Sequence, residues 1–306
     1  MRHPHLPDGV HVFERGWLSS NNILFVCAKH SVLVDSGYST HSVQTVELVK
    51  SVLGERPLDI LLNTHLHSDH CGGNAALQLS YAELKTCIPP GQAALVTAWD
   101  EVRLSYAPTG QICPQFTFDD LLLPGTIVRM ADADWEIHAS AGHDPHSVVL
   151  FEPSSRTLIS ADALWENGFG VVFPELEGES AFAEVGTTLD MIEALAPHWV
   201  IPGHGALFRY SAEVMQRSRQ RLNAFTKDPQ RHARHAAKVL LKFKLLELQR
   251  MEHKDFLGWA SSISYFQLMQ DRFFPSILIG DWLTELTADL VRSGAATRHA
   301  TVISNA

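Results

Sequence analysis

The histidine-rich block T-H-L-H-S-D-H-C-G-G, residues 64–73, constrains this chain more than any other feature. Its side chains alternate along a short loop, so His65 and His67 can converge on one point while Asp69 and His70 reach a second. Neutral imidazole and carboxylate groups bind divalent zinc, iron or manganese, whereas softer ions favour thiolates. The spacing therefore predicts a site for two metal ions.

Three further candidate ligands occur later in the chain, each after a strand-like stretch. His143 stands in A-G-H-D-P-H, Asp162 follows T-L-I-S-A, and His204 lies in V-I-P-G-H-G. A ligand at the end of a strand is where a folded site would place it. Most of the 17 histidines, by contrast, are expected to be solvated or hydrogen-bonded.

Five ordered blocks resemble the metallo-β-lactamase superfamily, in its glyoxalase II-like hydrolase branch. The blocks are V-D-S-G (34–37), H-x-H-x-D-H (65–70), G-H (142–143), A-D (161–162) and P-G-H-G (202–205). The resemblance covers roughly residues 10 to 208. It implies an α/β fold, the αββα sandwich, with two mixed sheets face to face, helices outside and the metals at one edge.

The resemblance also implies a role for each candidate ligand. His65, His67 and His143 would hold one metal ion, and Asp69, His70 and His204 the second. Asp162 would bridge the two ions. Asp35, in the V-D-S-G turn, is expected to accept a hydrogen bond from a ligand imidazole rather than to bind metal.

The hydrophobic pattern agrees with this fold up to residue 208. Short β-branched and aromatic runs at 22–28 and 31–35 predict paired strands, and a run at 58–63 leads into the ligand loop. Thr40 is expected to cap an amphipathic helix that Gly54 ends. Gly72 and Gly73 are expected to let the backbone turn tightly beneath the metals. We therefore predict a catalytic domain over residues 1–208.

Residues 209–306 are predicted to form a C-terminal helical module, with helices near 230–248, 255–271 and 275–293. A helix, a glycine turn and a final strand-like run near its end resemble a winged-helix module. A plain helical cap is the alternative. Residues 217–254 hold eleven Lys and Arg against three acids, a net +8, whereas the whole chain carries −10. This asymmetry favours docking between domains or binding of an anion.

Composition and termini place the chain among cytoplasmic enzymes. A chain of 306 residues can bury a large core, and 45% of its residues are hydrophobic. The first residues lack the apolar run of a secretory signal, and no stretch approaches a membrane helix. The four cysteines show no C-x-x-C spacing and are expected to be reduced. Subunit number stays open, a homodimer included.

The leading functional hypothesis is hydrolysis of an ester or thioester by a hydroxide shared between two divalent metal ions, with zinc favoured and iron or manganese as alternatives. Asp69 would orient the water and receive its proton. The candidate substrate contacts are His146, Phe169 in an apolar loop, and the basic residues Arg231, Arg234 and Lys238, which could hold an anionic tail of a small-molecule substrate.

Three alternatives remain. Phosphodiester cleavage would use the basic residues to follow an RNA backbone, although the net charge of −10 argues against nucleic acid. A sulfur dioxygenase could use the same motif with one iron. A regulatory protein could keep the metal site and act by binding a partner through its C-terminal helices.

Overall fold

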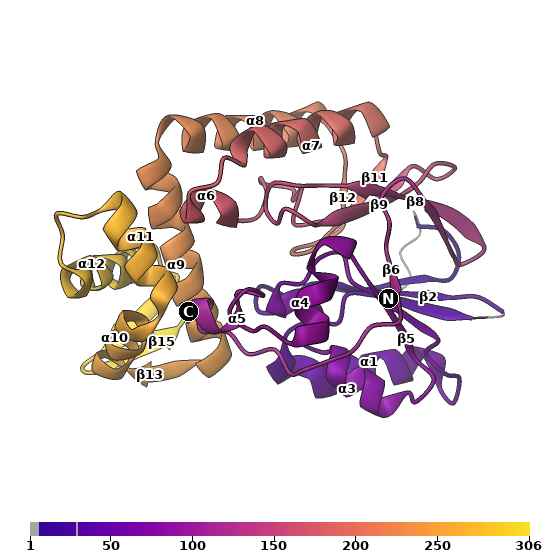
Figure 1. The fold of residues 1–306 in the computed structure, drawn as a ribbon, viewed down its shortest axis with the longest axis horizontal. Helices are drawn as coiled ribbons and strands as arrows, with labels where there is room; N and C mark the ends of the chain where they lie inside the picture. Colours follow the sequence, from indigo (N-terminus) through magenta and orange to yellow (C-terminus); the bar gives the residue numbers. More distant parts are fainter. Residues whose placement is uncertain (1–5, 29) are drawn as a thin grey trace.

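Two six-stranded sheets lie face to face at the centre of the computed structural model, which describes residues 6–28 and 30–306 (Figure 1). The first sheet contains, in spatial order, β1 (Val10–Phe13), β2 (Asn22–Val26), β3 (Ser31–Val34), β4 (Ile60–Leu62), β5 (Lys85–Ile88) and β6 (Asp120–Leu121). The second contains, in spatial order, β12 (Phe208–Arg209), β11 (Trp199–Pro202), β10 (Thr157–Ala161), β9 (Val148–Glu152), β8 (Ala133–Ala139) and β7 (Ile127–Met130).

Strand direction decides where the loops that follow the strands meet. In the first sheet β3, β4, β5 and β6 run parallel, so the segments after β3 and β4 leave from the same edge. In the second sheet β10 and β11 are parallel, so the residues after them also leave together. The remaining neighbours are antiparallel. Both sheets are therefore mixed, as the sequence predicted.

Apolar side chains fill the space between the sheets and the space under the outer helices. Between the sheets, Phe25 meets Trp135 edge-on with ring centroids 5.2 Å apart, within a cluster drawn from both sheets. Helices α1 (Ser42–Leu53) and α3 (Asn74–Ser80) cover the first sheet, and α7 (Phe182–Leu195) and α8 (Ala212–Lys227) cover the second. The fold is the αββα sandwich.

Two local details differ from the sequence predictions. Thr40 does not cap α1: it lies inside a short 3-10 turn, Ser39–His41, and α1 begins at Ser42 without a side-chain cap. Gly54 does end α1, with φ 61°. Gly72 has a helical φ of −63°, and a Cβ there would lie 2.4 Å from the Ser68 carbonyl oxygen. Close approach of backbone, rather than a tight turn, is what requires glycine at this position.

The C-terminal module contains four helices and a small sheet. The helices are α9 (Pro229–Leu248), α10 (His253–Ser262), α11 (Ser264–Phe273) and α12 (Ile279–Arg292), and the strands β13 (Arg250–Glu252), β14 (Ala296–His299) and β15 (Val302–Asn305) pair in the order β13-β15-β14. The β14–β15 hairpin follows α12 where the sequence predicted a glycine turn and a final strand, and the winged-helix assignment stays a prediction. One helix predicted over 255–271 is two helices, because Ile263 between them is extended, with ψ 120°.

The chain passes from the sandwich to the C-terminal module between α8 and α9. Val214 and Phe225 of α8 belong to the hydrophobic cluster under the second sheet, whereas α9 belongs to the cluster of α10 to α12. The boundary after residue 208 stays a prediction. Within the part of the chain that the structure describes, no helix has the length and apolar character needed to cross a bilayer. All four cysteines are thiols, and the Sγ atoms of Cys71 and Cys113 lie 3.7 Å apart.

Candidate metal centre

The seven predicted metal ligands lie together at one edge of the sandwich. His65 and His67 stand on the loop after β4, and Asp69 and His70 lie on the short helix α2 (Ser68–Cys71). The other three come from the second sheet: His143 from the β8–β9 loop, Asp162 from the residue after β10, and His204 from the loop after β11. Strand ends from both sheets thus bring together residues up to 139 positions apart in sequence.

The side chains form groups in which all candidate ligand atoms lie within 4.8 Å of one another. These groups are His65, His67 and His143; His65, His70 and Asp162; and Asp69, His70 and His204. The first and third are the sets that the sequence assigned to the two metal ions. The Nε2 of His65 lies 3.1 Å from Nδ1 of His67, and Nε2 of His204 lies 3.1 Å from Oδ2 of Asp69.

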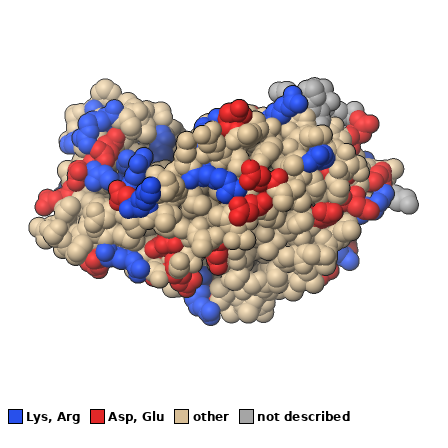
Figure 2. Space-filling view, turned by 90° about the horizontal axis from the view of Figure 1, so that it is seen from above, with Lys and Arg blue, Asp and Glu red and all other residues tan. Residues whose placement is uncertain are grey.

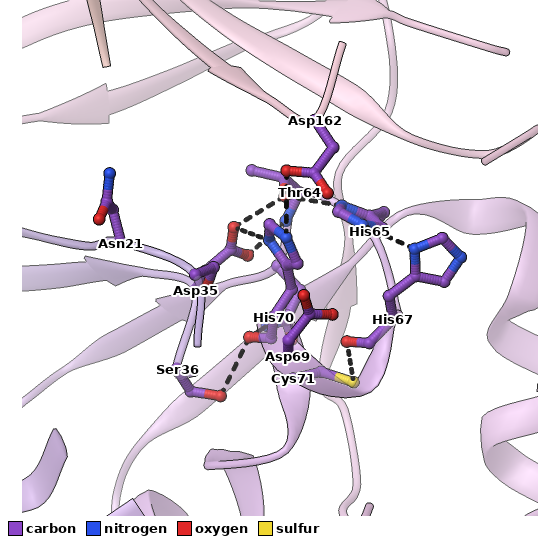
Figure 3. A network of polar contacts seen from close by, with 12 residues as sticks. Asn21, Asp35, Ser36, Thr64, His65, His67, Asp69, His70, Cys71 and Asp162 are labelled. Carbon is purple, nitrogen blue, oxygen red and sulfur yellow. Dashed lines mark hydrogen bonds and ion pairs between the residues drawn. The ribbon is translucent and has the colours of Figure 1, made fainter. Parts of the chain in front are cut away.

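The Asp162 carboxylate faces both sets. Its Oδ2 lies 3.4 Å from Nε2 of His143, while its Oδ1 lies 3.5 Å from Nε2 of His70 and 3.9 Å from Nε2 of His204. Figure 3 shows this carboxylate above His65 and His70. One oxygen toward each set is the orientation that a bridging ligand requires.

Buried nitrogen atoms without partners indicate that cations fit here. Nε2 of His70 and Nε2 of His143 are buried and have no hydrogen-bond partner. The opposite nitrogens are held from outside: Nδ1 of His143 lies 2.5 Å from the Val171 carbonyl oxygen, and Nδ1 of His204 lies 3.2 Å from that of Gly16. A donor fixed on one ring nitrogen leaves the other as a lone-pair ligand for a metal.

Asp35 fixes His70 in the same way (Figure 3). Its buried Oδ2 lies 2.7 Å from Nδ1 of His70 and accepts the Thr64 hydroxyl at 2.8 Å, while its Oδ1 accepts the Thr64 backbone N–H at 2.9 Å. Asp35 belongs to none of the groups of candidate ligands. The structure therefore places it as the outer support that the sequence predicted.

The pKa shifts of three groups in the cluster suit metal ions, whereas, against the effect of burial, neighbouring carboxylates raise the pKa of His70 and of His204. Burial and the neighbouring imidazoles of His70 and His67 lower the pKa of His65 well below its ordinary value. Burial, with His143, lowers the pKa of His67 to about 4. Although burial opposes it, the nearby imidazoles of His204 and His70 hold the pKa of Asp162 well below its usual range. Neutral imidazoles and an ionised carboxylate are the forms that bind a cation.

A cavity of about 440 Å³ opens above the cluster. His67, Asp69, His143, Asp162 and His204 line its floor. Its walls are mainly apolar, and their larger members are Trp17, Trp165, Val171, Phe173, Val239, Leu240 and Phe243. A small molecule with an apolar portion can therefore reach the candidate ligands directly.

None of the five predicted substrate contacts lines this cavity, and two of them, Phe169 and His146, do not line the adjoining cavity either. Phe169 is 1% exposed and belongs to the core, where its ring centroid lies 6.4 Å from that of Phe225. Phe173 lines the cavity instead. His146 is exposed beside Gly91 and does not line the cavity. The backbone turns sharply at Gly168, with φ 123°, so no regular period in the sequence identifies the cavity-facing ring.

Two cavity residues, Trp17 and Trp165, and the neighbouring Asp144 were not predicted from the sequence. The Trp165 indole N–H donates to Oδ1 of Asp162 at 3.2 Å, and Trp17 stacks on His204 with centroids 5.5 Å apart. Nε2 of His67 lies 3.9 Å from the buried carboxylate of Asp144. Asp144 directly follows His143, and Trp165 lies three residues after Asp162, so proximity to predicted ligands was the only available signal.

The three predicted basic contacts lie beside a second cavity that adjoins the first. Arg231, Arg234 and Lys238 line it together with Arg221, which no sequence pattern singled out. Figure 2 shows Lys and Arg side chains at the end of the molecule formed by the C-terminal helices, with acidic side chains among them.

Comparison with known proteins agrees with this fold and cluster. The family description "Metallo-beta-lactamase superfamily" matches residues 15–204. A hydroxyacylglutathione hydrolase from Brucella anthropi is 26% identical over 207 residues, which make up 68% of this chain and 64% of that relative. The match therefore spans just under two thirds of the relative's length.

Solved structures extend the likeness to the C-terminal module. A metallo-β-lactamase family protein from Thermus thermophilus has a TM-score of 0.57 at 16% identity, covering 98% of this chain and 99% of its own. A β-lactamase domain protein from Burkholderia ambifaria has a TM-score of 0.57 at 19% identity, covering 98% and 93%. A chain solved in a di-iron-bound form has a TM-score of 0.52 at 23% identity, covering 65% and 94%.

An αββα sandwich with a histidine and aspartate cluster at one sheet edge is the arrangement of a candidate metal-binding protein. The chain belongs to the metallo-β-lactamase superfamily, and a hydroxyacylglutathione hydrolase is among its relatives.

Proposed function

We propose that this protein is a hydrolase that cleaves an ester or thioester of a small molecule. The seven-residue cluster would hold two divalent cations, with zinc favoured over iron or manganese. The observation that carries the proposal is the Asp162 carboxylate, which faces both ligand sets at the floor of an apolar-walled cavity. A bridging carboxylate suits a pair of cations rather than one. The glyoxalase II-like relative supports a thioester, because its name identifies a hydrolase of an acylated thiol.

Two cations bound there would lower the pKa of water and polarise the carbonyl oxygen of the substrate. The chain itself supplies proton handling and positioning. Asp69 lines the cavity, and although burial opposes it, the hydrogen bond from His204 lowers the pKa of Asp69. An ionised Asp69 can orient the attacking water and accept its proton. Trp17 and Trp165 cover His204 and exclude solvent from that side of the cluster.

The charge arrangement supports this proposal over cleavage of RNA. Arg234 pairs with Glu285 at 2.8 Å and Asp289 at 2.6 Å, so α12 neutralises part of the basic surface of α9. Arg219 pairs with Asp190 and Glu193 of α7 in the same way. A nucleic-acid backbone needs a continuous run of free cations.

The direct test measures hydrolysis of a panel of thioesters, lactones and phosphodiesters by purified protein whose metal content has been determined. We expect thioester hydrolysis that His65→Ala lowers at least about a thousandfold, since metal ligation supplies the main chemistry. His138→Ala is the matched control, because His138 lies on β8 and pairs with Glu136 at 3.0 Å, outside the cluster.

Other outcomes would overturn the proposal. Cleavage confined to phosphodiesters, or oxygen uptake with one iron per chain, would replace it with one of the two other chemistries. Full rescue of a deletion phenotype by His65→Ala would instead indicate a partner-binding role. A cytoplasmic location and a homodimer stay predictions alongside it.

A further inference from the structure

A second cavity, of about 560 Å³, adjoins the one above the candidate metal ligands. The two share three lining residues: Asn167, Arg221 and His235. A ligand seated in the first cavity can therefore extend past these side chains into the second. The second cavity, called the basic cavity below, is lined by Arg221, Arg231, Arg234 and Lys238, and no acidic residue is among its lining residues in the described chain.

Arg221 carries a charge without a carboxylate partner. Its guanidinium lies over the rings of Phe169 at 5.6 Å and Phe225 at 5.3 Å, and its Nη2–H donates to Nε2 of His235 at 2.7 Å. Its Nε is buried without a hydrogen-bond partner. Burial and the Arg221 charge lower the pKa of His235 to about 3, so this imidazole is neutral and cannot balance the guanidinium.

The other cations of the basic cavity are only partly balanced. Among the described residues, Arg231 has no ion pair within 4.0 Å. Lys238 reaches only the Asp289 carboxylate, at 4.0 Å, whereas Arg234 pairs with Glu285 as well as with Asp289. Arg292 pairs with the same carboxylate. Arg221, Arg234 and Lys238 are partly buried, and such cations beside a cavity without acids are costly unless an anion balances them, whereas Arg231 is exposed at the rim.

The chemistry of this anion follows from the number of cations. One carboxylate would leave most of the four unmatched, whereas a phosphate or diphosphate offers several oxygens and more than one negative charge to guanidinium groups. The cavity beside the candidate metal ligands is apolar and suits the uncharged arm of such a molecule.

We propose that the basic cavity binds the phosphate groups of a phosphorylated thiol, and that the substrate is its acyl thioester, with the thiol arm in the apolar cavity. This inference rests on the proposed function for its reaction but not for its binding. The inference assigns Arg221 and Arg231 as specificity-determining residues. It also specifies that the thiol released by hydrolysis carries phosphate.

The test compares two thiols that share one arm: coenzyme A, which carries phosphates, and pantetheine, which carries none. Titration calorimetry on the full-length protein should show coenzyme A binding at least about tenfold more tightly than pantetheine, the effect of one charge-assisted hydrogen bond. Arg231→Gln, at an exposed position that folding does not require, should weaken coenzyme A about tenfold and leave pantetheine unchanged.

Arg219→Gln is the matched control. Arg219 lies on the same helix as Arg221, pairs with Asp190 and Glu193, and does not line the basic cavity. It should change neither affinity. Equal binding of both thiols, an equal loss with Arg219→Gln, or tighter binding of an RNA oligonucleotide than of coenzyme A would each overturn the inference.

Kinetics separates this inference from the proposed function. The same acyl group is offered on coenzyme A, on pantetheine and on glutathione, which carries carboxylates but no phosphate. A coenzyme A preference that Arg231→Gln removes through KM supports the inference. Hydrolysis of all three at similar KM overturns it and leaves the proposed function standing. Hydrolysis of none, with phosphate-dependent binding intact, overturns the proposed function alone.

Discussion

The Asp35→Asn substitution tests the hydrogen bond that supports the candidate ligand His70, without removing any candidate ligand atom. The amide keeps the size of the carboxylate and retains Oδ1 as an acceptor for the Thr64 backbone N–H. It replaces Oδ2, however, which faces Nδ1 of His70 at 2.7 Å and accepts the Thr64 hydroxyl. The new amide group would present hydrogens to the His70 ring N–H.

Two consequences follow, with different magnitudes. Each buried donor left without an acceptor costs about 1–3 kcal/mol, so with two donors, on His70 and Thr64, we expect the metal-free protein to lose about 2–6 kcal/mol of unfolding free energy. His70 can relieve the clash by moving its proton to Nε2, the nitrogen that faces the cluster. A proton there competes with the cation, so metal affinity should fall about 10–100-fold.

The assay is chelator competition for metal affinity, together with urea unfolding of the metal-free protein. Asp59→Asn is the control, because Oδ2 of Asp59 accepts both the backbone N–H and the hydroxyl of Ser31 but does not contact the cluster. It should cost stability without changing metal affinity. The reasoning would be refuted if Asp35→Asn bound metal as tightly as the wild type. It would also be refuted if Asp59→Asn lost as much metal affinity as Asp35→Asn.

Two further predictions concern crowding at the cluster and acid stability. A Cβ at Gly203 would lie 2.2 Å from Oδ1 of Asp162, so Gly203→Ala should remove metal by elemental analysis while the circular dichroism spectrum is retained. Gly186→Ala on α7 should keep its metal, because a Cβ there would make only an ordinary contact with Leu222, at 3.7 Å. Burial and the Arg221 charge lower the pKa of buried His232 to about 4, so between pH 6.5 and 4 the unfolded chain binds a proton that the folded chain excludes. Stability of the metal-free protein should therefore fall by up to about 3 kcal/mol across that window, and denaturant titrations should show a shallower fall for His232→Gln; an unchanged slope would contradict the assignment.

The resemblance carried by the five sequence blocks implied the sandwich, and local signals supported both this fold and the clustering of the seven candidate ligands. Short β-branched runs marked the strands, and each ligand or ligand pair stood directly after one. His65 and Asp162 come from different sheets, yet each was found from its own neighbourhood. Asp35 was found in the same way, from its place at the end of β3.

Walls built by distant segments could not be predicted in this manner. Trp17 reaches His204 from 187 positions away, and Arg221 reaches the cavity from the middle of a helix whose polar pattern resembles an ordinary solvated surface. In the loop after Asp162, glycines at 168 and 170 interrupt any period, so choosing Phe169 rather than Phe173 was wrong. Only tertiary packing decides such positions.

The metal content of wild type and of Asp162→Ala tests the central claim most directly. After reconstitution with zinc and removal of free metal, elemental analysis should give two ions per chain for the wild type and at most one for Asp162→Ala, because that carboxylate faces both ligand sets. A wild type that holds no divalent ion, or an Asp162→Ala variant that keeps two, would contradict the account.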